Sequence, residues 1–381
     1  MSRTWIRAAA GVAAASLLVG GLAACSAERT DEPGGETSSS DGSAAGSEML
    51  VGIAMPTKSL ERWNKDGSHL EELLQTAGYD TNLQYADNKV DQQISQIQNM
   101  INEGADILVI ASIDGTALAP ILSTAKEQDI TVIAYDRLIN DTPDVDYYAT
   151  FDNYMVGQMQ GQYIEEALGL ADGAGPFNIE PFAGSPDDNN AKFFFSGAWD
   201  VLLPYVEAGQ LATPSGKSPA SNDEWQSIGI PGWGSEDAQD EMTTRLNSFY
   251  ADGTALDAVL SPNDSLALGI AQALEGAGYT PGDGYPVLTG QDGDQANVLN
   301  IIAGKQSMTV WKDTRTLAER VATMIDEITA GETVETNDTE TYDNGVKVVP
   351  TYLIPPVVVT ADNIEDTLVA SGFYSAEDLG L

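Results

Sequence analysis

The stretch "ADILVIAS", residues 105–112, is an apolar run that does not alternate with polar residues. A strand with one wet face alternates, whereas a strand of a parallel sheet covered by helices on both faces is apolar throughout. The run therefore predicts a central strand of a parallel sheet. The residues before it support this, because an apolar stripe with helical spacing ends at Gly104 and consists of Val90, Ile94, Ile97 and Ile101.

Extended and helical stretches alternate along the chain on both sides of this run. The order strand, helix, strand is typical of α/β folds with parallel sheets. In the first half we expect strands at 49–56, 81–87, 105–112, 131–136 and 147–152. In the second half we expect strands at 177–184, 225–230, 256–264, 285–292 and 307–313.

Two such series predict two doubly wound α/β lobes. We expect one lobe to comprise residues 49–151 plus 293–345, and the other 152–292 plus 346–381. Three hinge segments would then join the lobes, near residues 150–153, 290–293 and 346–352. The extended tail 346–360 contains three prolines, so it is expected as an edge strand or an inter-lobe crossover.

Composition limits the classes of function. The chain has 381 residues, enough for two domains, and 42% of them are apolar, enough for a sizeable core. Acidic residues number 58 against 17 basic ones, which gives a formal net charge of −41. Such a charge repels phosphate backbones and anionic lipid headgroups, so nucleic acid is not an expected partner.

The first 48 residues have the pattern of an export signal and a tether. Arg3 and Arg7 precede the small and apolar run 8–24, which is expected as a signal peptide within residues 1–24. The run ends in "LAAC", which resembles the bacterial lipobox, so Cys25 is the expected lipidation site, although a lone cysteine could also be a core residue. Residues 25–48 are rich in Gly, Ser and acidic residues and predict a flexible tether. No second cysteine is present to form an internal disulfide.

Polar residues gather at the carboxyl ends of the expected strands. In "IAYDRLIND" (133–141) the apolar strand runs directly into Asp136 and Arg137, and "LSPND", "TGQD" and "VWKD" have the same order. Ligands of open parallel sheets bind outside the carboxyl ends of the strands. Two lobes with these ends facing each other would therefore enclose a polar cleft.

The residue types in this cleft suit a sugar. Each sugar hydroxyl both donates and accepts, so carboxylate and amide oxygens can receive its proton while Arg, Lys and Asn nitrogens donate to its lone pairs. The apolar face of a sugar ring also fits the flat surface of an indole. Trp63 and Trp233 lie in expected loops after strands.

The chain resembles the type I periplasmic sugar-binding proteins of ABC importers, in particular the branch with the multiple-sugar and xylose receptors. The resemblance runs from about Val51 to Phe373 and implies a sugar-loading receptor that is not an enzyme and needs no cofactor. Nine ordered segments carry it: "GIAMPTKSLERW", "ILVIASIDGT", "VIAYDRLIND", "YYATFDN", "GSPDDNNAKFF", "DAVLSPND", "GQD", "IIAGKQSMTVWKDTR" and "NGVKVVPTYLIPP".

Matching the family's motifs residue by residue implies ten ligand-binding side chains. Cationic donors, carboxylates, amides and two indoles make up the set: Arg62, Trp63, Asp136, Arg137, Asp188, Asn190, Trp233, Asn263, Asp292 and Lys312. The chain departs from the xylose receptors at Phe195, where those carry an arginine. The lost donor favours a pocket that accepts both pentoses and hexoses.

Each of these residues also has a purely structural interpretation. Arg62 and Trp63 could be an exposed helix start, and Asp136 and Arg137 a local salt bridge. Helix capping is the alternative for the four residues of the strand-end motifs, because Asp and Asn favour N-caps: Asp188, Asn190, Asn263 and Asp292. Trp233 could be core, and Lys312 could pair with an acid at the surface.

Other functions are weaker hypotheses. Asp187 with Asp188, or Asp292 with Asp294, could be offered as the acid and base of a glycoside hydrolase, but each pair is close in sequence rather than on opposed walls. "DGDQAN" (292–297) lacks the Gly and Glu of a calcium loop, so no metal is expected.

Together these patterns predict a lipid-anchored, extracytoplasmic receptor. It would bind an aldose such as xylose, glucose, galactose or arabinose and deliver it, as a monomer, to an ABC permease. An alternative is a receptor that signals to a membrane sensor for chemotaxis or gene induction.

Overall fold

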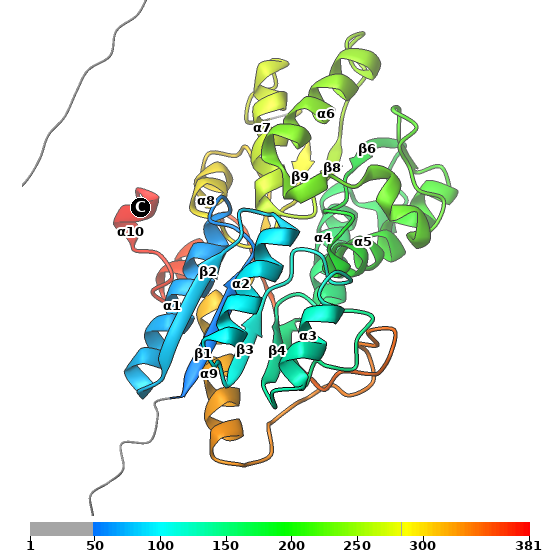
Figure 1. Ribbon diagram of the computed structural model, residues 1–381. Coiled ribbons are helices and arrows are strands. Elements are labelled where there is room, and N and C mark those ends of the chain that lie inside the picture. The colour runs from blue at the N-terminus through cyan, green and yellow to red at the C-terminus, as the bar shows by residue number, and fades with distance from the viewer. Residues whose placement is uncertain (1–48, 283) are drawn as a thin grey trace, which may run out of the picture. The chain divides into compact units, whose positions relative to one another are not determined.

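The computed structural model describes residues 49–282 and 284–381, which form two parallel sheets with helices on both faces (Figure 1). The expected signal peptide (1–24), Cys25 and the tether (25–48) lie outside the described residues.

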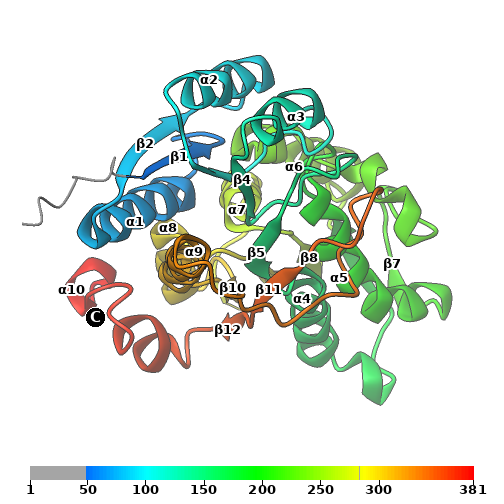
Figure 2. The same cartoon turned by 60° about the horizontal axis from the view of Figure 1, so that its bottom comes forward.

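The first sheet has six parallel strands in the order β11, β5, β4, β3, β1, β2. Its strands are β1 Leu50–Met55, β2 Asp80–Tyr85, β3 Ile107–Ile110, β4 Thr131–Tyr135, β5 Tyr147–Phe151 and β11 Thr351–Ile354. Helices cover both faces (Figure 2), with α1 Glu61–Ala77 and α9 Thr314–Thr329 on one and α2 Val90–Asn102 and α3 Ala119–Lys126 on the other.

Strand β3 is buried on both faces, as its apolar run predicts. Ile107 and Val109 pack into the cluster under α1 and α9, whereas Leu108 and Ile110 pack into the cluster under α2 and α3. Successive side chains of a strand point to opposite faces, so two dry faces require apolar residues at every position. The sequence pattern therefore identified this strand correctly.

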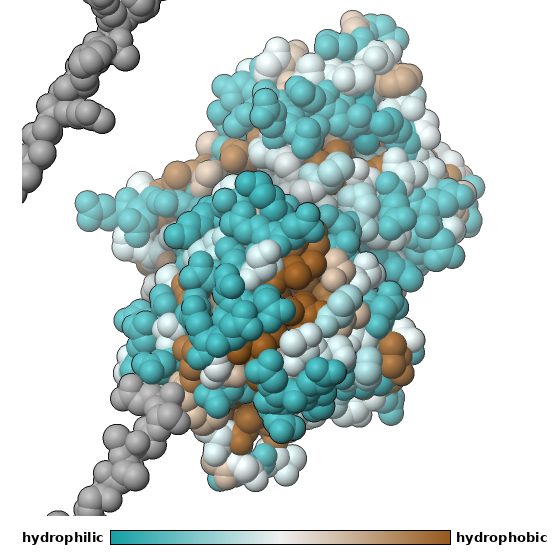
Figure 3. All heavy atoms as spheres, in the orientation of Figure 1, coloured by the Kyte–Doolittle hydropathy of each residue, from teal (hydrophilic) through white to brown (hydrophobic). Residues whose placement is uncertain are grey.

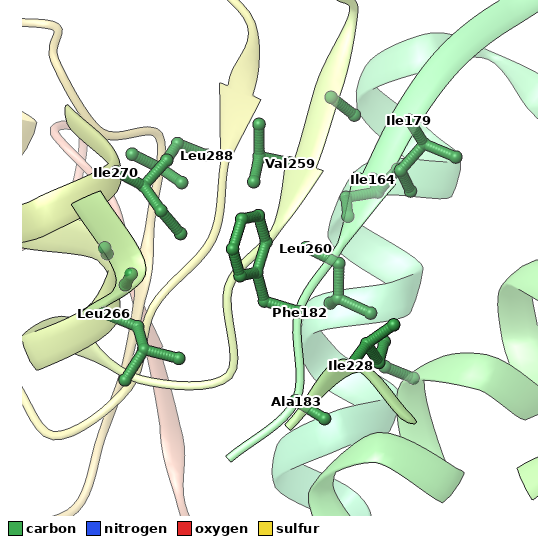
Figure 4. Packing of buried hydrophobic residues seen from close by; sticks show 14 of the residues in the cluster. Ile164, Ile179, Phe182, Ala183, Ile228, Val259, Leu260, Leu266, Ile270 and Leu288 are labelled. Atoms are coloured by element: carbon green, nitrogen blue, oxygen red, sulfur yellow. The ribbon is translucent and has the colours of Figure 1, made fainter. Parts of the chain in front are cut away.

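The second sheet has four parallel strands in the order β7, β6, β8, β9. Its strands are β6 Phe177–Pro181, β7 Leu211–Ala212, β8 Ala258–Leu260 and β9 Val287–Leu288. The helices around it are α4 Asn153–Leu168, α5 Asn189–Glu207, α6 Ser235–Phe249 and α7 Asp264–Gly276, with a 3₁₀ turn η1 at Leu170–Asp172. Figure 4 shows Ile164 of α4 and Ile270 of α7 on opposite sides of strand residues Val259 and Leu260.

Helices α4 and α5 are in very close contact because glycine lies between them. A Cβ at Gly157 would stand 2.0 Å from the carbonyl oxygen of Phe194. Only a residue without a side chain allows this approach. The contact fixes the position of α5, whose first turns reach the gap between the lobes.

The strand expected at 225–230 is wrong. Residues Asn222–Ile228 form the 3₁₀-helix η2, and only Gly229 makes a β-bridge, to Ala183. In a 3₁₀-helix the side chains at i and i+3 lie on the same side. Trp225 and Ile228 have this spacing and both are buried in the core of the second lobe, so packing selects the helical turn.

The structure also corrects two lobe boundaries. Strand β11, expected in the second lobe, is the edge strand beside β5 in the first sheet. Residues 293–313, expected in the first lobe, belong to the second, because α8 (Gln295–Ile302) packs on α7 and β10 (Thr309–Trp311) bridges Gln291 through Val310. The chain therefore crosses at Phe151–Asn153, Trp311–Thr314 and Ile354–Val357, and only the first crossing lies where the sequence predicted it.

After the last crossing, β12 (Val357–Val359) pairs antiparallel with β10. The chain then ends in a π-helical turn η4 (Glu365–Val369) and helix α10 (Ala376–Leu379). This segment packs through Leu368 and Tyr374 on α8 and on Trp311.

Hydrophilic residues cover most of the face seen in Figure 3, in keeping with the acidic composition. Among residues 49–282 and 284–381, no helix is long and apolar enough to span a bilayer.

The second lobe buries an ion pair in its core. Glu180 on β6 is fully buried, and its carboxylate accepts from Arg245 of α6 (3.1 Å) and from the hydroxyl of Tyr250 (2.7 Å). The Arg245 guanidinium also lies 3.9 Å from the ring centre of Phe182. A buried charge whose partner is removed is strongly destabilising.

We predict that Arg245→Ala lowers the free energy of unfolding by about 3–5 kcal/mol, because the buried charge of Glu180 loses its cationic partner. The control is Lys305→Ala, whose partner Glu275 is exposed, and we expect a loss below about 1 kcal/mol there. Urea denaturation followed by circular dichroism measures both. Equal losses for the two variants would contradict the prediction.

Candidate functional site

A pocket between the two lobes collects all ten side chains singled out from the sequence. The space between its walls, including the part open to solvent, is about 290 Å³. Three further residues line it that sequence reasoning did not select, namely Leu60, Phe194 and Gln291. The complete lining is Leu60, Arg62, Trp63, Asp136, Arg137, Asp188, Asn190, Phe194, Trp233, Asn263, Gln291, Asp292 and Lys312.

The sheet topology brings these residues together. In parallel sheets the carboxyl ends of all strands lie at one edge. Asp136 and Arg137 follow β4, Lys312 follows β10, and Asn263 stands between β8 and α7. Arg62 and Trp63 lie in the first turn of α1, and Asp188 precedes α5. The two lobes turn these edges towards each other across the pocket.

Asp136 has a left-handed backbone, with φ 58°. This conformation is uncommon for a residue with a side chain and persists only where the surroundings support it. Here the Asp136 carbonyl accepts from the Tyr148 hydroxyl (2.7 Å), the Thr150 hydroxyl (3.0 Å) and the Asn190 amide (2.6 Å). Because Asn190 belongs to α5, this backbone turn also joins the two lobes.

The adjacent Asp136 and Arg137 have different partners, so a salt bridge between the two does not explain them. The Asp136 carboxylate accepts from Arg62 Nη2 at 3.0 Å. Arg137 donates to the carbonyl of Ser112 (3.0 Å), and its Nε lies 2.9 Å from Asp188 Oδ2 in the other lobe. The two charged residues stand side by side after β4 because their side chains face different walls of one cleft: Asp136 faces Arg62, and Arg137 faces Asp188.

Arg62 is the centre of the charged network. Besides Asp136, its guanidinium contacts Asp66 through Nε (3.1 Å) and Asp292 through Nη1 (3.4 Å). Lys312 lies 3.0 Å from the same Asp292 oxygen. Burial raises the pKa of Asp136, but the charges of Arg62, Lys312 and Arg137 outweigh it and hold this pKa below its ordinary value. Asp136 is therefore ionised at neutral pH.

Asp188 and Asn263 both cap helices and line the pocket. The structural role and the place in the pocket wall are therefore both correct for these two residues. The Asp188 carboxylate accepts from the backbone N–H of Asn190 (2.9 Å) and from Trp233 Nε1 (3.1 Å). Asn263 Oδ1 accepts from the N–H of Leu266 (3.0 Å). Burial raises the pKa of Asp188 above its ordinary value, although Arg137 lowers it.

The two indoles lie in different environments. The guanidinium carbons of Arg62 and Arg137 are 4.4 and 5.1 Å from the ring centre of Trp63. Trp233 packs edge-on against Phe194, with ring centres 6.2 Å apart. Nε1 of Trp63 is buried without a hydrogen-bond partner among the described residues.

Phe194, rather than Phe195, lines the pocket. Phe195 is buried in the second lobe and stacks on Trp199 with ring centres 5.3 Å apart. In the sequence "KFFFSG" the three phenylalanines are equivalent, and only the orientation of α5 decides which one faces the pocket. Gln291 could have been selected from its place beside Asp292, since both follow β9.

A second group of hydrogen bonds supports the loop that carries Asp292. Asp264 accepts from the backbone N–H groups of Gly293 (3.0 Å) and Asp294 (2.9 Å) and from the Thr309 hydroxyl (3.0 Å). The backbone of Asp292 has a φ of 104°, so this support holds a strained residue in place. Burial, followed by the charge of Asp292, raises the pKa of Asp294 to about 7.

Within residues 49–282 and 284–381, no group of three or more His, Cys, Asp or Glu side chains is placed to hold a metal ion. The pocket instead offers a ring of donors and acceptors with aromatic surfaces.

Comparison with known proteins gives consistent matches. A family model described as "Periplasmic binding protein domain" matches residues 51–333. The multiple sugar-binding periplasmic receptor ChvE of Rhizobium radiobacter is 50% identical over 330 residues, which are 86% of this chain and 92% of that protein. The D-xylose-binding periplasmic protein of Escherichia coli K12 is 38% identical over 332 residues, 87% of this chain and 93% of its own.

A solved structure extends the match to three dimensions. The ABC transporter solute-binding protein of Clostridium phytofermentans, solved with bound β-D-glucose, is 52% identical. It superposes with a TM-score of 0.83 and covers 87% of this chain and 99% of its own.

Proposed function

Because this chain belongs to the periplasmic sugar-binding proteins of ABC importers, we propose that its inter-lobe pocket binds one aldose outside the cytoplasm and that the protein delivers the sugar to an ABC permease. Candidate sugars are glucose, xylose, galactose and arabinose. The expected type I fold and the membership of a family of non-enzymatic receptors are confirmed by these matches.

One observation supports the sugar proposal above all others. Three cations and three carboxylates from both lobes line a single pocket, together with two indoles and two asparagines. Such a wall can donate to and accept from several hydroxyl groups at once, while the aromatic rings cover apolar C–H faces. The charges of the wall balance, so a neutral solute suits it better than an ion.

The carboxylate pairs weighed as hydrolase groups have other partners. The Asp188 carboxylate contacts Arg137, Trp233 and the start of α5. The Asp187 carboxylate accepts from the hydroxyl of Ser185. These contacts and the family membership both favour binding over hydrolysis.

We predict micromolar or tighter binding of at least one aldose, and a loss of about 10–100-fold in affinity for Asp292→Ala and for Asp136→Ala. Each variant removes a charged acceptor, and hydrogen bonds to charged groups contribute about 1.5–3 kcal/mol. A thermal-shift screen of aldoses followed by calorimetry measures this. Asp326→Ala, at an exposed position of α9, is the control and should bind as the wild type does. Unchanged affinity in both pocket variants would refute the site.

We further propose that the lobes close on the sugar by bending at the three crossings, Phe151–Asn153, Trp311–Thr314 and Ile354–Val357. Each lobe contributes ligand contacts, so the sugar favours the closed form by its differential affinity. Solution X-ray scattering should therefore give a smaller radius of gyration with D-glucose than without it. An identical radius in both states at saturating sugar would exclude closure.

The anchor remains a proposal from the sequence. We propose that Cys25, after "LAA" and the apolar run 8–24, carries the lipid that holds the receptor at the membrane. Cys25→Ser in the full chain should move the protein from the membrane fraction to the medium or periplasm, as seen by cell fractionation. If the variant stays in the membrane fraction, Cys25 is not the anchor.

A further inference from the structure

Behind the pocket, two buried side chains are joined to Arg62: Asp66 contacts it directly, and Tyr135 contacts Asp66. Asp66 lies one turn after Arg62 on α1 and is fully buried, as is Tyr135 at the end of β4. Neither residue lines the pocket. One Asp66 oxygen accepts from Arg62 Nε at 3.1 Å, and the other accepts from the Tyr135 hydroxyl at 2.5 Å.

We infer that Asp66, held in place by Tyr135, is a positioning residue that aims the Arg62 guanidinium at the bound sugar. The inference rests on the proposed function, since it concerns how the pocket recognises that sugar.

The geometry supports this role because a guanidinium is a planar fork with five N–H donors. The bond from Nε to Asp66 fixes the rotation of the plane, which leaves Nη1 and Nη2 directed at the pocket. Nη2 contacts Asp136 at 3.0 Å, whereas Nη1 stands 3.4 Å from Asp292, a long contact. Nη1 is therefore the donor with capacity left for a sugar hydroxyl.

The charge balance points the same way. The pocket wall already pairs three cations with three carboxylates, namely Arg62, Arg137 and Lys312 with Asp136, Asp188 and Asp292. Asp66 adds a fourth carboxylate at a fully buried position, which costs free energy. Burial raises the pKa of Asp66 to about 6, although Arg62 lowers it. A carboxylate in such a place is best explained by what it does to Arg62.

The indole of Trp63 completes the fixation. Its ring centre lies 4.4 Å from the Arg62 guanidinium carbon. Asp66 fixes the edge of the guanidinium and Trp63 covers its face, so little rotamer freedom is left to lose when sugar binds. Preorganisation of this kind increases affinity by reducing the ordering cost of binding.

The test is a double-mutant cycle on the full mature protein, with D-glucose as the probe and calorimetry at pH 7.5 as the measurement. We expect Asp66→Asn to weaken binding about tenfold and Tyr135→Phe to weaken it a few-fold, since each removes one hydrogen bond of the fixation. In an Arg62→Met background, Asp66→Asn should cause no further loss. A residue that acts only through Arg62 has no effect once Arg62 is gone, whereas a general structural defect weakens binding in both backgrounds.

A matched control exists on the surface of the same lobe. The Tyr79 hydroxyl donates to Asp326 at 2.7 Å at an exposed position away from the pocket, so Tyr79→Phe should leave D-glucose affinity unchanged. If Asp66→Asn does not fold, or if Arg62→Met binds too weakly to measure, the comparison of Tyr135→Phe with Tyr79→Phe decides, because each loses only a hydroxyl.

Two results would overturn the inference while leaving the proposed function intact. One is wild-type affinity in both Asp66→Asn and Tyr135→Phe. The other is an equal loss from Asp66→Asn with and without Arg62. Failure of the wild type itself to bind any aldose would instead refute the proposed function.

Discussion

Burial of charge in a narrow gap is the constraint on which the rest of this site depends. Three cations and three carboxylates of the wall are shielded from water, and an unpaired charge there would cost several kcal/mol. The structure resolves this by making almost every charge the partner of another. Arg62 contacts three carboxylates, and Arg137 reaches across to Asp188. Because the wall neutralises itself, it presents directed donors and acceptors without a net charge.

The same constraint explains the strained backbone at two places in the wall. Asp136 and Asp292 both have positive φ, and both carry a carboxylate that must face the cations of the first lobe. Their conformations are maintained by hydrogen bonds to the backbone. Tyr148, Thr150 and the lining residue Asn190 donate to the Asp136 carbonyl, and Asp264 accepts from the backbone N–H of Gly293, the residue after Asp292. The surrounding scaffold thus stabilises two strained residues and holds their carboxylates in place for binding.

Much of the fold follows from local patterns. The apolar run of β3 and the stripe of α2 depend on residues close in the chain, so their spacing reveals them. The strand predicted at 225–230 is wrong because Ile228 and Ile230 alternate as in a strand, whereas Trp225 and Ile228 have the i, i+3 spacing of a 3₁₀ turn, and only the tertiary packing decides between the two. The partner strand of β11 likewise depends on contacts made across the chain.

By itself, the sequence determined the α/β class, the order of elements and the polar tips at the strand ends, since these follow from periodicity and from residue chemistry. The resemblance to a receptor family added the ten candidate ligand-binding residues. Only the tertiary structure decided that these ten share one pocket, that Phe194 rather than Phe195 joins them, and that Asp66 stands behind Arg62. The physical reason is distance along the chain: Arg62 and Asp292 are 230 residues apart, and no local pattern encodes a contact that forms only when two lobes fold and meet.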